Sequence, residues 1–111
     1  MLAWSFFENV DREGKNVVLQ FKPQPAQLMR IACVYSEWAD PQAGEKLLSF
    51  AAITDDPPPE VAGAGHDRCP INLASSAVAA WLAPQGRTTA ELQAALDDRE
   101  RPYYEHQVLA A

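Results

Sequence analysis

Cysteine and histidine are scarce in this sequence of 111 residues. The chain holds only Cys33 and Cys69, without a C-x-x-C pair, and only two histidines. Two distant thiols with so few histidines fit neither the ligand spacing of a zinc site nor the dense cysteine framework of a small secreted domain. We therefore predict no disulfide, no metal site and no cofactor, and we expect reduced thiols in a cytoplasmic protein.

Basic residues are also few. Nine Lys and Arg stand against fifteen Asp and Glu, which gives a formal net charge of −6. A protein that binds nucleic acid through bulk positive charge has the opposite balance. The composition therefore argues against tight, nonspecific DNA binding by this chain.

Long hydrophobic runs are absent. The apolar start of the chain ends at Glu8 and no basic leader precedes it, so we expect neither a signal peptide nor a membrane-spanning segment, and no contact with a membrane. With 48% hydrophobic and 22% charged residues, the composition is that of an ordinary globular protein. The length corresponds to one domain, or to part of one.

The first part of the chain predicts a β-hairpin. A short aromatic strand over 3–8 and a second strand over 17–21 flank a turn at Glu13-Gly14-Lys15. The segment Lys22-Pro23-Gln24-Pro25 is expected to end the second strand, because proline cannot donate a hydrogen bond within a sheet.

A second hairpin is predicted after a linking turn. The third strand lies within 29–38, a loop follows at 40–44, and the fourth strand covers 46–54. The fourth strand is a nearly continuous apolar run, which is typical of a strand buried on both faces. Trp38 and Trp81 are interpreted as core anchors.

Two short helices and a last strand complete the prediction. A helix over 75–82 follows a serine cap and ends before Pro84. Thr88 and Glu91 form a capping box at the start of a helix that runs to Asp98. A final strand is expected over 103–108.

Glu8 is the first candidate site residue. It lies among Trp4, Phe6 and Phe7, and burial by aromatic rings favours the protonated form of a carboxyl group. A carboxyl group that stays neutral near physiological pH can act as a general acid. The alternative is a strand position that faces solvent.

The segment His66-Asp67-Arg68-Cys69-Pro70 is the second candidate. It follows a proline-rich link over 57–59, which is either extended or opens a helix, and glycines that permit tight turns. Histidine can move protons near neutral pH and arginine can bind a phosphate. The alternative is a surface pair with a capping histidine. A nucleophilic Cys69 activated by His66 is disfavoured by their spacing.

Several motifs in this order resemble the SOS response-associated peptidase (SRAP) family. They are the aromatic strand with Glu8, the strand ending in Glu37-Trp38, the run Ser49-Phe50-Ala51-Ala52-Ile53-Thr54, the His66 to Pro70 segment, Trp81-Leu82, and the closing stretch from Leu92 to His106. The likeness covers nearly the whole chain, but only the carboxyl-terminal half of the family's domain. It implies an α+β fold, a β-rich and mostly antiparallel partial barrel with two short helices near the C-terminus.

The resemblance also implies a function. In the SRAP family an amino-terminal cysteine attacks the ring-opened aldehyde of an abasic site in single-stranded DNA and closes a thiazolidine, which crosslinks protein and DNA. The likeness places Glu8 as the catalytic acid and base and His66 as the residue that assists the reaction and its reversal. It places Arg68 and Thr54 in DNA binding.

The chain departs from the family pattern in ways that limit this activity. Position 2 is Leu2 instead of the family's cysteine, and Ser5, Asn9 and Cys69 replace Gly, Trp and Met. We therefore predict that residues 1–111 form a single partial SRAP-like domain that lacks the amino-terminal half and does not crosslink DNA alone. Whether the chain is an enzyme stays open.

The predicted partners follow from the same argument. A partial barrel leaves strand edges and an apolar face uncovered, so we expect either a homodimer or a complementing amino-terminal half. By resemblance the chain contacts single-stranded DNA weakly. The alternative function is an interaction module without catalysis that retains the fold.

Overall fold

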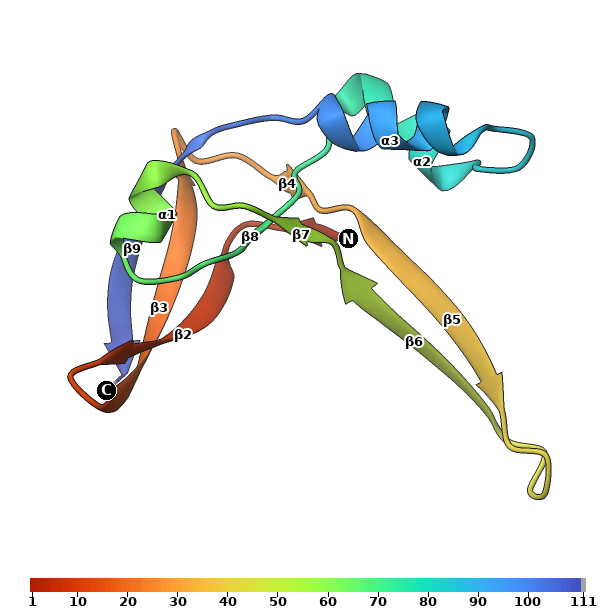
Figure 1. The fold of residues 1–111 in the computed structure, drawn as a ribbon, viewed down its shortest axis with the longest axis horizontal. Coiled ribbons are helices and arrows are strands. Elements are labelled where there is room, and N and C mark those ends of the chain that lie inside the picture. Colours follow the sequence, from red (N-terminus) through yellow and green to blue (C-terminus); the bar gives the residue numbers. More distant parts are fainter. Residues whose placement is uncertain (111) are drawn as a thin grey trace.

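The computed structural model describes residues 1–110, which form an arch with two arms (Figure 1). One arm is a three-stranded antiparallel sheet in the order β2-β3-β9, built from Phe6–Arg12, Lys15–Gln24 and Tyr103–Ala110. The other arm is a two-stranded ribbon of β5 (Cys33–Ala39) and β6 (Lys46–Ala52). The predicted β-rich antiparallel fold with short helices near the C-terminus is confirmed, and within 1–110 the sheets do not close into a barrel.

Alternation along β2 and β3 gives the sheet one buried face. Phe6 and Val10 are buried while Phe7 points outward, and Leu19 and Phe21 on β3 have no exposed surface. The predicted first hairpin is confirmed, with its turn at Glu13 and Gly14, both of which have positive φ. Such a two-residue turn matches the twist of the strands that it joins.

The predicted end of the second strand was wrong, because β3 continues through Pro23 to Gln24. Pro23 lies opposite Tyr104 of β9, and the Tyr104 amide donates to Glu60 Oε1 instead of to β3. On its other side β2 has already ended, at the pair Phe6 and Phe21. Proline is tolerated here since neither neighbour requires its missing N–H.

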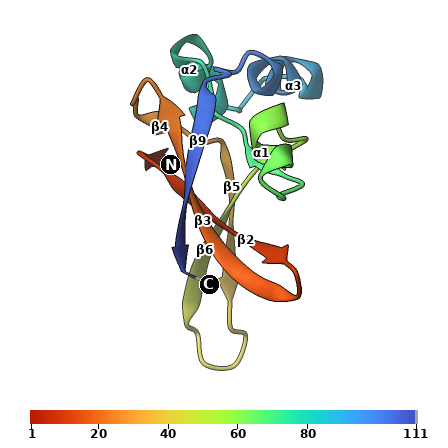
Figure 2. The same cartoon turned by 90° about the vertical axis from the view of Figure 1, so that its left-hand side faces the viewer.

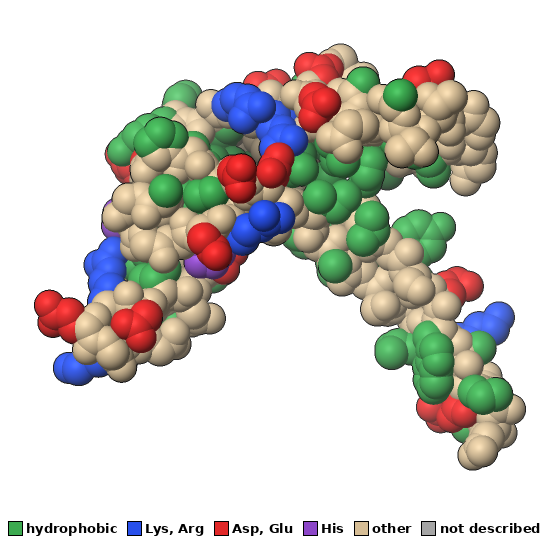
Figure 3. Space-filling view, viewed as in Figure 1, with side chains coloured by type: hydrophobic (Ala, Val, Ile, Leu, Met, Phe, Trp, Pro, Cys, Tyr) green, Lys and Arg blue, Asp and Glu red, His purple; other side chains and the backbone are tan. Residues whose placement is uncertain are grey.

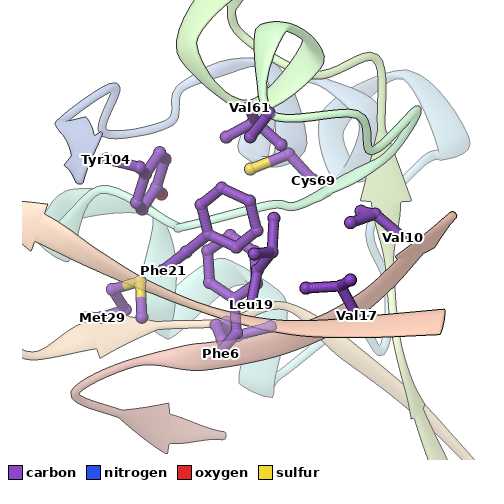
Figure 4. Close-up of a cluster of buried hydrophobic side chains, with 11 residues drawn as sticks. Phe6, Val10, Val17, Leu19, Phe21, Met29, Val61, Cys69 and Tyr104 are labelled. Carbon is purple, nitrogen blue, oxygen red and sulfur yellow. The ribbon is translucent and has the colours of Figure 1, made fainter. Parts of the chain in front are cut away.

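The main core lies between this sheet and α1 (Pro59–Gly63), as Figure 4 shows. Pro59 opens the helix, so the proline-rich link does start a helix. Figure 2 shows α1 beside the sheet and the remaining helices at one end of it. The core consists of the following buried side chains: Phe6, Val10, Val17, Leu19, Phe21, Met29, Val61, Ala64, Cys69, Tyr104 and Ile31.

The top of the arch is built from short pieces. Two small antiparallel pairs, β1 (Leu2–Ala3) with β4 (Met29–Arg30) and β7 (Thr54–Asp55) with β8 (Cys69–Pro70), join the two arms. A second small core of Ala32, Ile71 and Leu73 lies beneath the helices.

The predicted helices near the C-terminus are confirmed. A 3₁₀ turn over Ser75–Ala77 leads into α2 (Val78–Leu82), and α3 covers Thr89–Asp97. The Thr88 hydroxyl accepts from the Glu91 amide at 3.1 Å, which is the predicted N-cap. No helix within 1–110 is long and apolar enough to cross a membrane.

The second hairpin is confirmed, but its predicted burial was wrong. Every residue of β6 is exposed, and Trp38 on β5 keeps 56% of its surface accessible, so it is not a core anchor. Trp81 does pack against the second core, and its Nε1 donates to the Cys33 carbonyl at 3.1 Å. The ribbon is exposed because no other described element covers its faces.

This projecting ribbon makes the chain unusually open. The radius of gyration is 16.6 Å, whereas a compact domain of this length has about 13 Å. The principal extents of 44 × 39 × 22 Å agree with an arch instead of a sphere. The stability of the chain therefore rests on the β2-β3-β9 arm and its core.

A pair of leucine substitutions tests this division. Leu19→Ala should lower the free energy of unfolding by about 3 kcal/mol, because it leaves a cavity in the main core. Leu48→Ala, at a position with 63% exposure on the ribbon, should change it by less than about 0.5 kcal/mol. Urea unfolding followed by circular dichroism measures both, and equal losses would contradict the assignment of the core.

Candidate active site

Glu8 occupies the inner face of the sheet arm. It lies on β2 between the buried Phe6 and Val10 and opposite Leu19 of β3. Its side chain is 27% exposed, so the carboxyl group sits at the rim of the core, not on the solvent-facing side of the strand. Partial burial penalises the charged form of a carboxylate.

His66 meets Glu8 from the loop after α1. Its Nε2 lies 3.0 Å from Glu8 Oε2, and its Nδ1 lies 2.8 Å from the Arg68 carbonyl oxygen. The Arg68 amide also lies 3.3 Å from this nitrogen, but the shorter contact to the carbonyl oxygen, which only accepts, favours the tautomer with the hydrogen on Nδ1. The loop thus fixes the orientation of the ring and favours this tautomer.

This tautomer leaves one shared proton between the two side chains. With Nδ1 protonated, a hydrogen bond between His66 Nε2 and Glu8 Oε2 requires a single proton, held by either atom. The pair is then either a neutral acid beside a neutral imidazole or a carboxylate beside an imidazolium. Both forms keep the contact, so the proton can move between the two side chains without rearrangement.

The pKa of Glu8 is raised above its ordinary value of 4.5. The largest cause is burial, the positive charge of His66 opposes it, and the nearby Asp67 carboxylate adds to it. Because its pKa is raised, Glu8 keeps its proton to a higher pH than an ordinary glutamate, which suits it to act as a proton donor.

Successive inward positions of β2 hold the loop in place. Glu8 contacts His66, Arg12 Nη2 donates to the Ala64 carbonyl at 3.3 Å, and a Cβ on Gly65 would lie 3.6 Å from Val10 Cβ. Gly65 has a φ of +106°, which side-chain-bearing residues rarely adopt. Glu8, Val10 and Arg12, on one face of β2, therefore lie against three consecutive residues of the turn, 64–66.

Arg68 and Thr54 form the second predicted pair. Arg68 Nε donates to Thr54 Oγ1 at 3.0 Å, and Nη2 donates to the Thr54 carbonyl at 2.7 Å. Thr54 thereby holds the guanidinium beside the loop that carries His66. Thr54 is thus a support for Arg68, and a phosphate contact of either residue stays a prediction.

Burial disfavours a nucleophilic role for Cys69. Cys69 is buried in the main core, which raises the pKa of its thiol to about 11. His66 is engaged by Glu8 and Arg68, so no base is provided for this thiol. Within residues 1–110, no group of three potential metal ligands is formed by His, Cys, Asp or Glu.

The four residues predicted from the sequence form two contacting pairs, Glu8 with His66 and Arg68 with Thr54, and their role in catalysis or DNA binding stays a prediction. Sequence reasoning missed Arg12 and the electrostatic effect of Asp67. The signal for Arg12 was its spacing, since residues 8, 10 and 12 share one strand face. Its loop partner could not be identified, because nothing in the sequence places Ala64 against β2.

The sequence model of the family described as SOS response associated peptidase (SRAP) matches residues 1–110. The chain belongs to the SRAP family. The predicted resemblance is therefore confirmed, and with it the link to the SOS response in the family's description. No curated protein matches the SRAP chain.

Two solved structures show the same fold. A crystal structure of a protein from Bacteroides thetaiotaomicron aligns with a TM-score of 0.73 at 19% identity, over 97% of this chain and 47% of its own. A protein from Bordetella bronchiseptica aligns with a TM-score of 0.70 at 21% identity, over 100% of this chain and 54% of its own. The SRAP chain thus spans about half the length of these structures. That it forms a single partial domain stays a prediction.

Two substitutions should shift the pKa of Glu8 in opposite directions. Asp67→Asn removes a nearby negative charge and should lower it, whereas His66→Gln removes a positive charge and should raise it. A carbon-13 NMR titration of the Glu8 carboxyl group measures both. Glu13→Gln, in the exposed turn of the same hairpin, serves as a control that leaves the titration unchanged.

The same titration has a consequence for stability. The folded chain binds the Glu8 proton more tightly than the unfolded chain, so the contribution of Glu8 is fully present below pH 4.5 and is lost as the pH rises through the folded pKa. In the NMR titration, an increase in the pKa of Glu8 after Asp67→Asn would contradict this account of the site.

Arg12→Ala tests whether β2 positions His66. Loss of the bond to Ala64 should speed amide hydrogen exchange of Gly65 and His66 about five-fold, as expected for one hydrogen bond. It should also bring the pKa of Glu8 closer to 4.5, because the loosened loop admits water. Lys15→Ala, across the hairpin from Arg12, is the matched control. Unchanged exchange and titration in Arg12→Ala would show that the loop is held by other contacts.

Proposed function

We propose that this chain provides the acid–base part of an SRAP active site that acts on the ring-opened aldehyde of an abasic site in single-stranded DNA. The observation that carries the proposal is the 3.0 Å contact between Glu8 Oε2 and His66 Nε2 at the rim of the core. Family membership supports the reaction class, and the raised pKa of Glu8 supports its role as the acid.

The chemistry needs one group that releases and recovers a proton. The amine of an amino-terminal cysteine adds to the aldehyde carbon and gives a carbinolamine. Its hydroxyl leaves as water when Glu8, in the acid form, donates a proton, and the nitrogen then releases its N–H proton to the Glu8–His66 pair, so that a neutral imine remains. The thiol sulfur then adds to the imine carbon and its proton ends on the nitrogen. Aldehyde and aminothiol thus yield a thiazolidine and one water.

His66 restores the acid between these steps. Because its Nε2 lies 3.0 Å from Glu8 Oε2, it can take the proton that the nitrogen releases after water has left and pass it to the carboxylate. In the reverse direction the nitrogen's proton returns to the sulfur as the carbon–sulfur bond breaks, and the same pair then moves a proton from the attacking water to the imine nitrogen. This double role requires Nε2 to be able to accept a proton, as it can in the tautomer that the Arg68 carbonyl favours.

The DNA backbone is proposed to meet this site at Arg68. Thr54 binds two of the guanidinium nitrogens, Nε and Nη2, and leaves Nη1 for a phosphate oxygen. Figure 3 shows acidic and basic side chains gathered with a histidine on the inner side of the sheet arm. With a net charge of −6, one such contact supports only weak binding by the chain alone.

The nucleophile is the part that these 111 residues do not provide. A thiazolidine needs an amine and a thiol on the same residue, and both cysteines, Cys33 and Cys69, are internal. We therefore propose that the isolated chain forms no stable crosslink with DNA.

A second candidate is an interaction module in which Glu8 and His66 no longer catalyse. The exposed apolar ribbon favours it, because such a surface serves assembly. The two candidates differ in whether the acid–base pair accelerates the reaction when a nucleophile is added.

Free L-cysteine can replace the missing nucleophile in a test. The chain is incubated with a single-stranded oligonucleotide that contains one abasic site, and the thiazolidine product is followed by mass spectrometry. The wild-type chain should accelerate its formation about 10²-fold over the reaction without protein, as expected for general acid–base catalysis. Glu8→Gln should lose nearly all of this acceleration.

Glu13→Gln is the matched control, and it should keep the wild-type rate because Glu13 lies in the exposed hairpin turn. No acceleration by the wild-type chain, or equal rates in wild type and Glu8→Gln, would refute the acid–base proposal and favour the interaction module.

A further inference from the structure

The largest apolar surface of the chain lies on the ribbon and the cavity at its base. We define the ribbon surface by its exposed large side chains: Val34, Tyr35, Trp38, Leu47, Leu48 and Phe50. Figure 3 shows hydrophobic side chains along this arm and under the helices. Soluble monomers rarely expose so large an apolar patch without a binding function.

Both faces of the ribbon are apolar. The strand register puts Tyr35 beside Phe50 on one face, and Trp38 beside Leu47 on the other. An isolated two-stranded ribbon is marginally stable in water. A ribbon that is apolar on both sides therefore requires a partner that covers both.

The cavity extends one of these faces toward the helices. It has a volume of about 760 Å³, and Cys33, Tyr35 and Phe50 of the ribbon line it together with Leu73, Trp81 and Leu82. Its lining is largely apolar, so it suits inserted hydrophobic side chains instead of a charged ligand.

The exposed area indicates the size of the missing contact. The accessible surface is 7455 Å², and it exceeds the roughly 6,100 Å² expected for a compact protein of 12.2 kDa by about 1,400 Å². Burial of this excess on each side would give an interface of about 2,800 Å², which is in the range of permanent assemblies.

We propose that the ribbon surface and its cavity bind the other half of an SRAP fold, which is the part that the two solved structures carry beyond the region matched here. Those chains are about twice as long and share the fold of this chain, so each has about as many residues again outside the matched region. That number of residues is enough to cover both faces of the ribbon.

A second copy fits less well. Two copies related by a twofold axis and packed face to face bury one side of each ribbon and leave the other apolar side in water. Each copy also has a net charge of −6, so their association brings like charges together.

The proposal that the ribbon surface binds the other half of an SRAP fold rests on family membership and not on the proposed reaction.

The experiment compares the chain alone with the chain joined to the unmatched part of the Bordetella bronchiseptica protein. A flexible linker joins the two, because tethering raises the effective concentration to the millimolar range and offsets the 21% identity. The readout is amide hydrogen exchange over 33–39 and 46–52. Exchange in the ribbon should slow at least about ten-fold in the fusion, and light scattering should show the chain alone as a monomer.

Variants on each face test the contact itself. In the fusion, Trp38→Ser and Phe50→Ser should each remove most of the ribbon protection, because large aromatic side chains dominate such interfaces. Tyr103→Ser is the control, since Tyr103 has similar exposure but lies on the other arm. Both ribbon side chains are exposed in the free chain, so unchanged protection of β3 verifies that the variants fold.

Three results would overturn the proposal. The first is a dimer of the chain alone with protected ribbon amides, which would make a second copy the occupant. The second is a monomer of the chain alone in which the ribbon amides exchange as slowly as those of β3. The third is a fusion in which the ribbon amides exchange as fast as in the free chain. None of these readouts depends on catalytic activity. A result that overturns the docking proposal is therefore distinct from a result that refutes the acid–base function.

Discussion

One strand face organises both the stability and the chemistry of this protein. The inward positions of β2 alternate with outward ones, so Phe6, Glu8, Val10 and Arg12 all point toward α1 and the loop behind it. Phe6 and Val10 anchor the core, while Glu8 and Arg12 hold the loop that carries His66. A shift of one residue in the register of β2 would expose the core residues and separate the acid–base pair together.

The degree of burial at Glu8 is what makes the pair useful. Full burial would fix the carboxyl group in its neutral form, and full exposure would leave its pKa at the ordinary value. At the rim of the core, burial and the neighbouring Asp67 favour the acid, while the positive charge of His66 favours the carboxylate. The net effect of these opposed influences is a pKa above the ordinary value.

Local patterns predicted most of the elements but not what covers them. The turn at Glu13-Gly14, the cap at Thr88 and the second hairpin follow from short-range chemistry that the structure repeats. The apolar run over 46–54 predicts a strand with two buried faces, yet β6 is exposed. A hydrophobic pattern indicates that a strand face is suited to burial, but it does not indicate which segment buries it.

The residues that meet at the candidate site were predictable for a different reason. Composition and spacing left Glu8 and His66 as open candidates, and the likeness to the SRAP family selected them. Long-range contacts such as Arg12 with Ala64, or Pro23 opposite Tyr104, depend on how distant segments dock. Neither has a signature in the local sequence.

The bond from the Tyr104 amide to Glu60 Oε1 has a consequence for how the sheet can grow. It occupies a donor on the outer edge of β9 that an added strand would otherwise pair with, and α1 stands over the same position. Edge strands with free donors invite pairing with other chains. Glu60 therefore disfavours strand addition at the start of β9, beside α1.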